Sequence, residues 1–423
     1  MIFQGDFGKI RSSERKGFTV LSLFTVLRFK RLTVQCKINN HRMNEKAKMC
    51  KLRPLSLMLC TCILVPASSY AMASKKAKIY DKILPERKDL EICGGHQGPV
   101  IKQGDPGTED NKYGFEGGRA FKYKGDYHLF TAERCGDPII VKMRMAHWKS
   151  KDGIKWQRVS TLYESSGNFT GEDPRAALWA PMPYYNEKEG RWNLFYTTYR
   201  CKPNDPTGWY ENYEGKIWRA VSTVPGYDGL DGPYEDIGIV LQPGPDSGPW
   251  EGLQGTDSFY AYQIGDEWYA LFGSAQTQTD MNPDYPKWCV GLARAPEMAG
   301  PWKRWSEMNP IKFHPVFAEN PIVVKLKDGR YTATLDGGSS TEFGYSFSDD
   351  GIGWSRAAFV DIASKFDQWW TVMRTPLGLI PENDGTYTVF YTAYTKSNFA
   401  CVGMVKLKEI NLKDYHSSEI KPK

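Results

Sequence analysis

Three carboxylic acids, a tryptophan and an arginine occupy the same position in a sequence pattern that this chain repeats. Beyond about residue 110, each copy runs from a leading residue through an apolar stretch and a turn into an aromatic-rich strand. The residues that lead the five copies are Glu116, Trp179, Asp257, Glu319 and Arg374. Units of about 55–75 residues with four short strands each are typical of propeller blades. The pattern therefore predicts an all-β fold, a five-bladed β-propeller, in which these side chains converge on the axis.

The residue types at these positions fit chemistry on a sugar. Hydrolysis of a glycosidic bond needs a protonated carboxylic acid at the leaving oxygen and an ionised carboxylate on the other side of the ring. A third carboxylate raises the pKa of the acid by repulsion between like charges. Trp179 offers a flat face to sugar C–H groups, and Arg374 can hold a hydroxyl or carboxylate group. Any one carboxylate could instead form an ion pair or cap a turn, but three at one repeat position favour a functional site.

Short motifs around these residues resemble those of a known family. Trp179-Ala180-Pro181, Asp257-Ser258-Phe259 and Glu319-Asn320-Pro321 each lead to a Gly-x-aromatic turn. They are similar to the signatures of five-bladed propeller glycoside hydrolases of family 43, to which families 32, 62 and 117 are related. The resemblance covers residues 110–410 and implies an inverting hydrolase in which Glu319 is the general acid and Asp257 tunes its pKa.

The catalytic base has two candidates. Where family 43 has Asp-Pro on the first blade, this chain has Glu116-Gly117, and the longer glutamate side chain changes the geometry of attack. The second candidate is Asp173, which is followed closely by Arg175 in the string Gly-Glu-Asp-Pro-Arg. This string resembles one in propeller mannoside phosphorylases and one in the agar-oligosaccharide hydrolases of family 117. Both candidates stay open, and Arg175 is a candidate for substrate binding.

Further residues could shape a binding site. His314 precedes the fourth copy and Trp370 precedes the fifth, so both are candidates for substrate contact. Two segments, 199–215 and 276–287, are predicted to be long loops, which on a compact scaffold usually shape a binding site. We expect no cofactor and no metal. Some relatives carry a calcium ion on the axis, usually with a histidine of the fifth blade, and this chain has no histidine near Arg374.

The first 73 residues differ from the rest of the chain in charge. They hold 13 Lys and Arg against 3 Asp and Glu, which leaves 42 Lys and Arg against 46 Asp and Glu in the remainder. A nucleic-acid partner is therefore not expected. Basic residues 46–53, an apolar run over 55–66 and the small residues Ala71-Met72-Ala73 predict a secretory signal peptide at about 43–73 rather than a stable membrane insertion. A lipoprotein is less favoured, because the residues before Cys60 are bulky.

These observations define one expectation and its rivals. Residues 1–73 form an extension and signal peptide, residues 74–110 lead into the propeller or supply its closing strand, and residues 111–423 form the propeller. The protein is expected to be a secreted or periplasmic, exo-acting and inverting glycoside hydrolase of plant or algal oligosaccharides or polysaccharides. The alternatives are a glycoside phosphorylase on the same scaffold and a non-catalytic carbohydrate-binding propeller. Five cysteines follow residue 73, and their spacing identifies no disulfide and no metal motif.

Overall fold

The computed structural model describes residues 90–204, 209–277, 279–314, 317–336 and 341–410. The predicted signal peptide and most of the predicted lead-in lie outside the described residues. Strands dominate the described chain, together with three short 3-10 turns: η1 (Tyr227–Asp231), η2 (Ser306–Met308) and η3 (Ile362–Ser364). No helix in the described part is long and apolar enough to cross a membrane.

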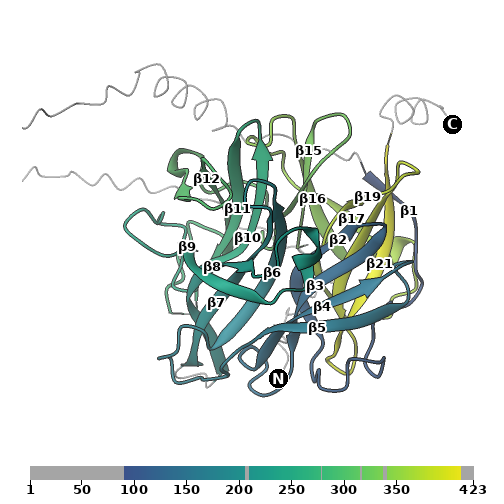
Figure 1. Ribbon diagram of the computed structural model, residues 1–423, viewed down its shortest axis with the longest axis horizontal. Helices are drawn as coiled ribbons and strands as arrows, with labels where there is room; N and C mark the ends of the chain where they lie inside the picture. Colours follow the sequence, from purple (N-terminus) through teal and green to yellow (C-terminus); the bar gives the residue numbers. More distant parts are fainter. Residues whose placement is uncertain (1–89, 205–208, 278, 315–316, 337–340, 411–423) are drawn as a thin grey trace, which may run out of the picture. The chain divides into compact units, whose positions relative to one another are not determined.

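The described strands pair antiparallel into five units, of which four have four strands and the fifth has an additional short strand (Figure 1). One parallel pair, Gly215↔Gly255, joins β8 of the second unit to β10 of the third. The first blade consists of β2 (Phe115–Tyr123), β3 (Asp126–Arg134), β4 (Met143–Ser150) and β5 (Trp156–Glu164). The second consists of β6 (Ala177–Asn186), β7 (Arg191–Asn204), β8 (Trp209–Ser222) and β9 (Tyr234–Leu241). The third consists of β10 (Gly255–Ile264), β11 (Glu267–Ala275), β12 (Trp288–Ala295) and β13 (Lys303–Arg304). The fourth consists of β14 (Ile322–Lys325), β15 (Tyr331–Asp336), β16 (Glu342–Ser348) and β17 (Ala358–Asp361).

The fifth blade joins the two ends of the described chain. It consists of β18 (Val372–Pro376), β20 (Tyr387–Tyr394), β21 (Ala400–Glu409) and β1 (Leu90–Gly95), with the short β19 (Ile380–Pro381) also paired to β20. β1 comes from the segment 74–110 and pairs with β21, beside which it lies in Figure 1. Inner strands of successive blades contact one another, β2 with β6, β6 with β10 and β10 with β14, and β18 contacts both β15 and β2. The ring is therefore closed, and the fold is a five-bladed β-propeller.

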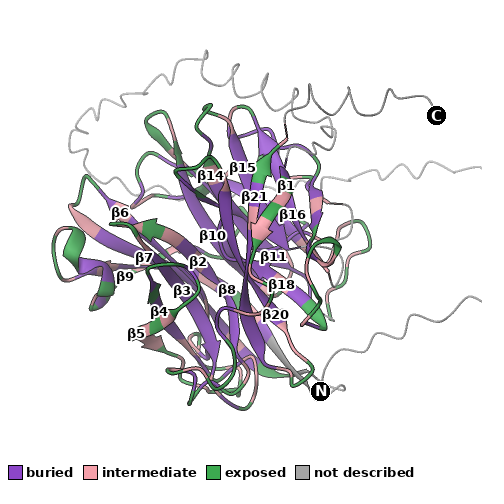
Figure 2. Ribbon diagram, turned by 90° about the vertical axis from the view of Figure 1, so that its right-hand side faces the viewer, coloured by how far each residue is buried: buried purple, intermediate pink, exposed green. Residues whose placement is uncertain are grey.

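Glycine turns and buried strand faces explain why these segments form blades. The turn after each blade's first strand carries a glycine with φ between 60° and 90°, a conformation that glycine adopts without strain: Gly125, Gly190, Gly265, Gly329 and Gly385. Figure 2 shows that the strands at the centre of the blades are buried along most of their length. Aromatic side chains fill the space between neighbouring blades, as where Phe195 of β7 packs on Phe259 of β10 at 5.2 Å between ring centroids.

One predicted loop is largely strand. The prolines of residues 199–215 predict an irregular segment, but β7 and β8 extend as a paired ribbon as far as the pair Asn204↔Trp209. Such a ribbon has free outer edges, and a proline is tolerated where its missing N–H would face outward. The other predicted loop, 276–287, is irregular and is closed by a backbone hydrogen bond of 2.9 Å from Gln276 N to Lys287 O.

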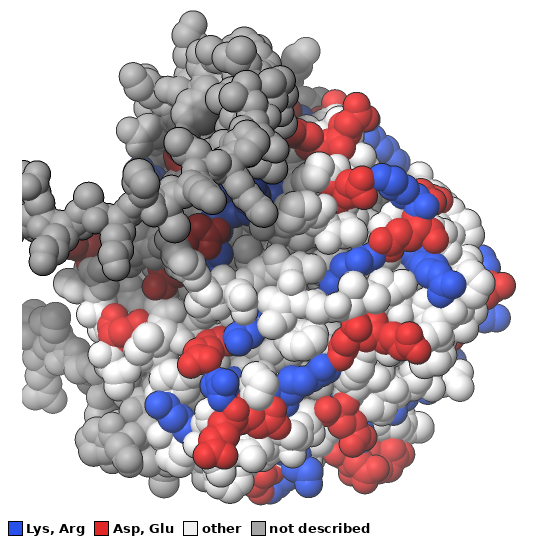
Figure 3. Space-filling view, turned by 60° about the vertical axis from the view of Figure 1, so that its left-hand side comes forward, with Lys and Arg blue, Asp and Glu red and all other residues white. Residues whose placement is uncertain are grey.

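The surface and the cysteines agree with the composition. On the face in Figure 3, acidic and basic side chains are interspersed, in keeping with the small net charge of residues 74–423.

All five cysteines of the described chain are free thiols: Cys93, Cys135, Cys201, Cys289 and Cys401. The fold is therefore held together by packing and hydrogen bonding, without a disulfide among the described residues.

Candidate active site

The leading residues of four blades share an unusual local backbone. Each is followed by a residue with positive φ, namely Gly117 (58°), Ala180 (49°), Ser258 (51°) and Asn320 (53°). In the first three blades the pairing register shifts at this point. Positive φ is costly for residues other than glycine, so its recurrence marks a backbone conformation that the surrounding fold imposes. The sequence alignment of the copies therefore corresponds to a structural equivalence, and in the fifth blade Arg374 lies in a register shift of its own.

Arg374 lies at the centre of the cluster that these residues form. Its Nε is 3.4 Å from Glu116 Oε1, its Nη2 is 3.4 Å from Glu319 Oε2, and its Nη1 is 3.6 Å from Asp336 Oδ2. The side chains of the three acids are at most 8% exposed, whereas that of Arg374 is 29% exposed. The structure thus brings Glu116, Glu319 and Arg374 together, and the arginine is the member of the cluster that reaches solvent.

Glu116 is surrounded by hydrogen-bond donors. It accepts hydrogen bonds from Thr375 Oγ1 at 3.0 Å and from Tyr394 OH at 3.2 Å. Arg134, at the end of β3, lies 3.8 Å from it and donates to Tyr394 OH. Burial alone would raise the pKa of Glu116, but Arg374 and Arg134 outweigh it, and the net effect is a lowered pKa. Glu116 is therefore an ionised carboxylate at neutral pH.

Glu319 has the opposite electrostatic character. Burial raises its pKa to about 7, Arg374 opposes the rise, and the negative charges of Asp257 and Glu116 add to it. Asp257 also has a raised pKa because of burial, moderated by the neighbouring polar groups of Tyr199, Ser258 and Thr197. Near neutral pH, Glu319 is thus partly protonated and can act as a proton donor.

Asp336 is a fourth carboxyl group that the repeat pattern did not indicate. It ends β15, and its backbone N–H donates to Glu319 O at 3.0 Å across the hairpin. Its Oδ2 accepts hydrogen bonds from Asn320 at 3.3 Å and Thr375 at 3.4 Å, while its Oδ1 is buried without a partner among the described residues. Burial raises its pKa well above the usual range, against the effect of Arg374. The one sequence signal for it is its position opposite Glu319 in the fourth hairpin.

Trp179 is placed beside the cluster by its own blade. It is partly buried against apolar neighbours, and its cross-strand partner Thr197 is one of the groups that lower the pKa of Asp257. Its indole Nε1 is buried without a partner among the described residues. Gly117, which follows Glu116, lies close to Ala180, which follows Trp179: a Cβ built on Gly117 would be 3.8 Å from Ala180 Cα. The first strands of the first and second blades therefore approach one another directly behind these two leading residues.

Asp173 and Arg175 have neighbours outside this cluster. Asp173 Oδ1 accepts a hydrogen bond from the backbone of Arg175 at 2.8 Å. The guanidinium group of Arg175 donates to Tyr196 OH at 2.7 Å, pairs with Asp236 and lies 5.0 Å from the ring centroid of Trp218. These partners belong to β7, β9 and β8, so the structure ties Arg175 to the outer strands of the second blade. These contacts do not join it to Arg374.

His314 and Trp370 lie in different surroundings from the carboxylates. His314 Nδ1 accepts a hydrogen bond from Phe317 N at 3.1 Å, its ring meets Phe359 edge-on, and burial lowers its pKa. Trp370 is 3% exposed and packs edge-on against Trp369 in the apolar core of the fourth and fifth blades. The described residues include no group of three or more His, Cys, Asp or Glu side chains arranged to hold a metal ion.

The closed ring with carboxyl groups at its centre is an architecture found among glycoside hydrolases. The chain matches no family model, and it matches no curated protein. Among solved structures it is similar to Zg3597, a family 117 glycoside hydrolase from the marine bacterium Zobellia galactanivorans. The two share 13% identity with a TM-score of 0.52, over 79% of this chain and 99% of the other.

Two further solved structures are similar to this chain to the same extent. One is described only as a glycoside hydrolase and shares 16% identity, with a TM-score of 0.52 over 79% of this chain and 94% of the other. The other is a complex of BT0996 with RGII, whose protein shares 15% identity, with a TM-score of 0.52 over 79% of this chain and 95% of the other. At such identities the likeness concerns the fold, and the argument for an activity has to come from the site.

Proposed function

We propose that this protein is a glycoside hydrolase whose active site is the carboxyl cluster around Arg374. The observation that carries the proposal is the difference between Glu116 and Glu319. The pKa of Glu116 is lowered, whereas that of Glu319 is raised to about 7, although both contact the same guanidinium group. Two carboxyl groups whose surroundings drive their pKa values apart are what an acid–base pair requires.

In this proposal Glu319 protonates the leaving oxygen and Glu116 activates water. Since both contact Arg374 at 3.4 Å, their nearest oxygens are at most about 9 Å apart, and inverting enzymes use about 6.5–9.5 Å between the two carboxyl groups. The negative charges of Asp257 and Glu116 help to keep the proton on Glu319 by repulsion. Arg374 fixes the acid and the base relative to one another, and it meets the substrate on its exposed side.

The assignment of the base has a direct test between Glu116 and Asp173. Replacing the true base by alanine removes the group that activates water and leaves room for a small anion. Azide should therefore restore turnover in Glu116→Ala and give a glycosyl azide of inverted configuration. Rescue in Asp173→Ala instead, with Glu116→Ala unresponsive, would transfer the role to Asp173.

The exo mode of action and the export of the protein belong to the same proposal. Tyr199, where the extended β7–β8 ribbon begins, interacts with Asp257. The ribbon therefore starts beside the carboxyl cluster. Together with the loop 276–287, it would close one side of the centre and favour removal of a terminal sugar. A secreted or periplasmic location, through a signal peptide at about 43–73, matches a polymeric plant or algal substrate.

The two rival functions have less support from the site. A phosphorylase needs free cationic groups for phosphate, but Arg134 is 2% exposed and both it and Arg374 are engaged with carboxylates. A non-catalytic sugar-binding propeller would gain little from four buried carboxyl groups, each of which costs desolvation free energy.

A screen of aryl glycosides and of plant and algal oligosaccharides tests the proposal. The wild-type protein and the variant Glu235→Gln, which changes an exposed residue of β9, should both release a sugar from at least one of them. Glu319→Gln should lose hydrolysis of the unactivated oligosaccharide. Cleavage that requires phosphate would establish the phosphorylase, and binding of an oligosaccharide without any cleavage would establish the sugar-binding propeller.

A further inference from the structure

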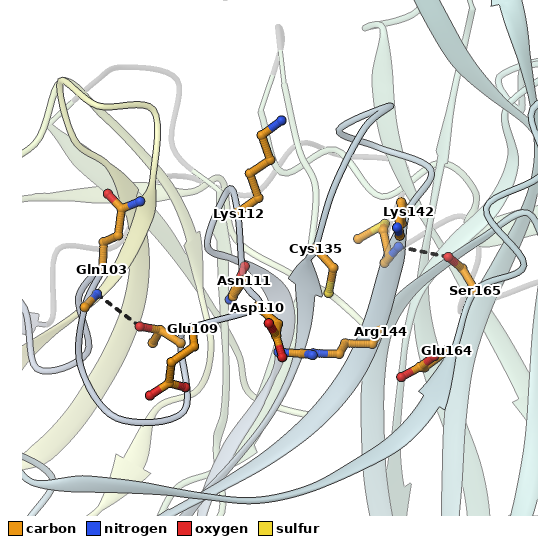
Figure 4. A pocket seen from close by; sticks show the side chains of 13 residues that line it. Gln103, Glu109, Asp110, Asn111, Lys112, Cys135, Lys142, Arg144, Glu164 and Ser165 are labelled. Atoms are coloured by element: carbon orange, nitrogen blue, oxygen red, sulfur yellow. Dashed lines mark hydrogen bonds between the residues drawn. The ribbon is translucent and has the colours of Figure 1, made fainter.

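A cavity lies at the end of the first blade where β2 begins. It has a volume of about 710 Å³ and is lined by residues 103–112, by the end of β3, the start of β4 and the end of β5. β2 begins at this end of the first blade, with Glu116 as its second residue. The cavity therefore lies over the first blade, on the side where the inner strand starts (Figure 4).

Arg134 links the carboxyl cluster to the segment that lines the cavity. Arg134 contacts Glu116 on one side and donates to Tyr113 O at 2.7 Å on the other. Lys112 and Cys135, which line the cavity, are the chain neighbours of Tyr113 and Arg134. The lining of the cavity is therefore adjacent in sequence to residues that contact the carboxyl cluster.

Several polar groups of the cavity have no partner in the described chain. Asn111 is 2% exposed, and its Oδ1 accepts a hydrogen bond from Gly114 N at 2.9 Å, but its Nδ2 is buried and unpartnered. The side chains of Asp110, Glu164 and Lys142 line the cavity and make no hydrogen bond or salt bridge with the described residues. Figure 4 shows the carboxyl group of Asp110 near the guanidinium end of Arg144, with Glu164 on the neighbouring strand. The carboxylates of Asp110 and Glu164 can therefore accept hydrogen bonds from a ligand in the cavity, and the amine of Lys142 can donate them.

The charges and residue types of the cavity select the class of ligand. Arg144 is paired with the buried Glu133, and Lys112 is paired with Asp137, so neither is a free cation. The free charges of the lining are then mostly carboxylates, which repel sulfate and uronate groups. The lining contains no aromatic side chain, so a ligand would be held by hydrogen bonds and not by stacking. The volume lies within the range of about 300–1,000 Å³ that small-molecule sites occupy.

We propose that this cavity binds an uncharged, hydroxyl-rich sugar unit of the same oligosaccharide that the carboxyl cluster cleaves, away from the scissile bond. Carboxylates accept hydrogen bonds from sugar hydroxyl groups, and the amine of Lys142 donates to them. The inference rests on the proposed function because it assigns the sugar unit to a substrate of the central site. It adds that the substrate is longer than one sugar and uncharged at this position.

Calorimetric binding to the Glu319→Gln protein, which prevents turnover, tests the inference. The probes are di- and tetrasaccharides of the agarose, xylan and arabinan series, with tetrasaccharides of carrageenan and polygalacturonate as charged counterparts. We expect one uncharged tetrasaccharide to bind about tenfold more tightly than its disaccharide and than the charged probes. The double variant Asp110→Ala/Glu164→Ala should lose this gain with length, whereas the exposed control Glu235→Ala should keep it.

The outcomes separate this inference from the proposed function. An equal gain with length in the double variant, preferred binding of a charged tetrasaccharide, or no binding by any probe would overturn the cavity assignment. If the wild-type protein still hydrolyses a glycoside, only the cavity assignment fails. If the gain with length depends on Asp110 and Glu164 but no glycoside is hydrolysed, the cavity stands as a sugar site and the hydrolase fails. Thermal unfolding of each variant checks that the fold is intact.

Discussion

Replacing Glu319 by glutamine should remove a loss of stability that the wild-type protein suffers as the pH rises from 5 to 8, whatever the substitution costs through loss of a charged partner of Arg374. Glutamine has the shape of the protonated acid and cannot ionise. In the folded protein, burial raises the pKa of Glu319 to about 7, and in the unfolded chain it returns to about 4.3. Since the folded pKa is the higher one, the folded state binds more protons than the unfolded state between these values. The free energy of unfolding therefore falls as pH rises from about 4.3 through about 7.

The size of this effect follows from the two pKa values. Integrating the proton linkage between pH 5 and pH 8 gives a loss on the order of 2–3 kcal/mol in the free energy of unfolding of the wild-type protein from this one group. The glutamine variant does not suffer this loss. Its stability relative to the wild type should therefore rise by roughly 2–3 kcal/mol over the same interval, whatever the substitution costs at pH 5.

Urea unfolding at pH 5 and at pH 8 measures this difference without any substrate. Glu235→Gln, at an exposed position of β9, is the matched control, and its stability relative to the wild type should not change between the two pH values. A constant difference between Glu319→Gln and the wild type at both pH values would show that Glu319 is already ionised at pH 5. The electrostatic argument for a general acid would then fail.

Three further changes have defined outcomes. Asp257→Asn removes a negative charge that raises the pKa of Glu319, so the alkaline limb of the kcat/KM profile should move to lower pH; an unchanged limb would exclude Asp257 as the tuning group. Glu251→Ala removes the buried carboxylate that pairs with Arg304, both side chains being 3% exposed, and leaves the exposed Asp246, at 3.2 Å, as the remaining carboxylate partner; it should cost about 3 kcal/mol in urea unfolding, whereas a loss below about 1 kcal/mol would contradict the burial of this pair. Gly118→Ala would bring a Cβ to within 2.0 Å of a β3 carbonyl oxygen at φ 119°, and should lower the free energy of unfolding by on the order of 2 kcal/mol or more, detectable in the same assay.

Most of the fold could be predicted because its signals are local. A glycine turn followed by alternating aromatic residues recurs five times, and the structure has a blade at each copy. The ribbon at 199–215 could not be predicted, because its prolines and polar residues are typical of a loop, while the pairing that makes it a ribbon depends on the opposite strand. The fifth blade takes its outer strand from Leu90–Gly95, and the sequence offered this closure only as one of two possibilities.

The site was predictable where it followed the repeat. Glu116, Glu319 and Arg374 share one repeat position, and the bulge that follows the leading residues turns them to a common centre. Asp336 was not predictable in this way, since it ends a second strand and enters the cluster only across the hairpin from Glu319. Arg134 and Tyr394 reach Glu116 from the ends of two other strands, a contact that depends on closure of the ring. Trp370, a residue type suited to sugar stacking, packs in the core, because residue type alone does not report which side of a blade it faces.

The leaving-group dependence of Glu319→Gln tests the central claim most directly. A general acid matters for a poor leaving group and hardly at all for an activated one. We expect the variant to lose at least about a thousandfold in kcat/KM, about 4 kcal/mol, on the unactivated oligosaccharide and less than about tenfold on the dinitrophenyl glycoside of the same sugar. An equal loss on both substrates, or no loss on either, would contradict the assignment of Glu319 as the acid of a glycoside hydrolase.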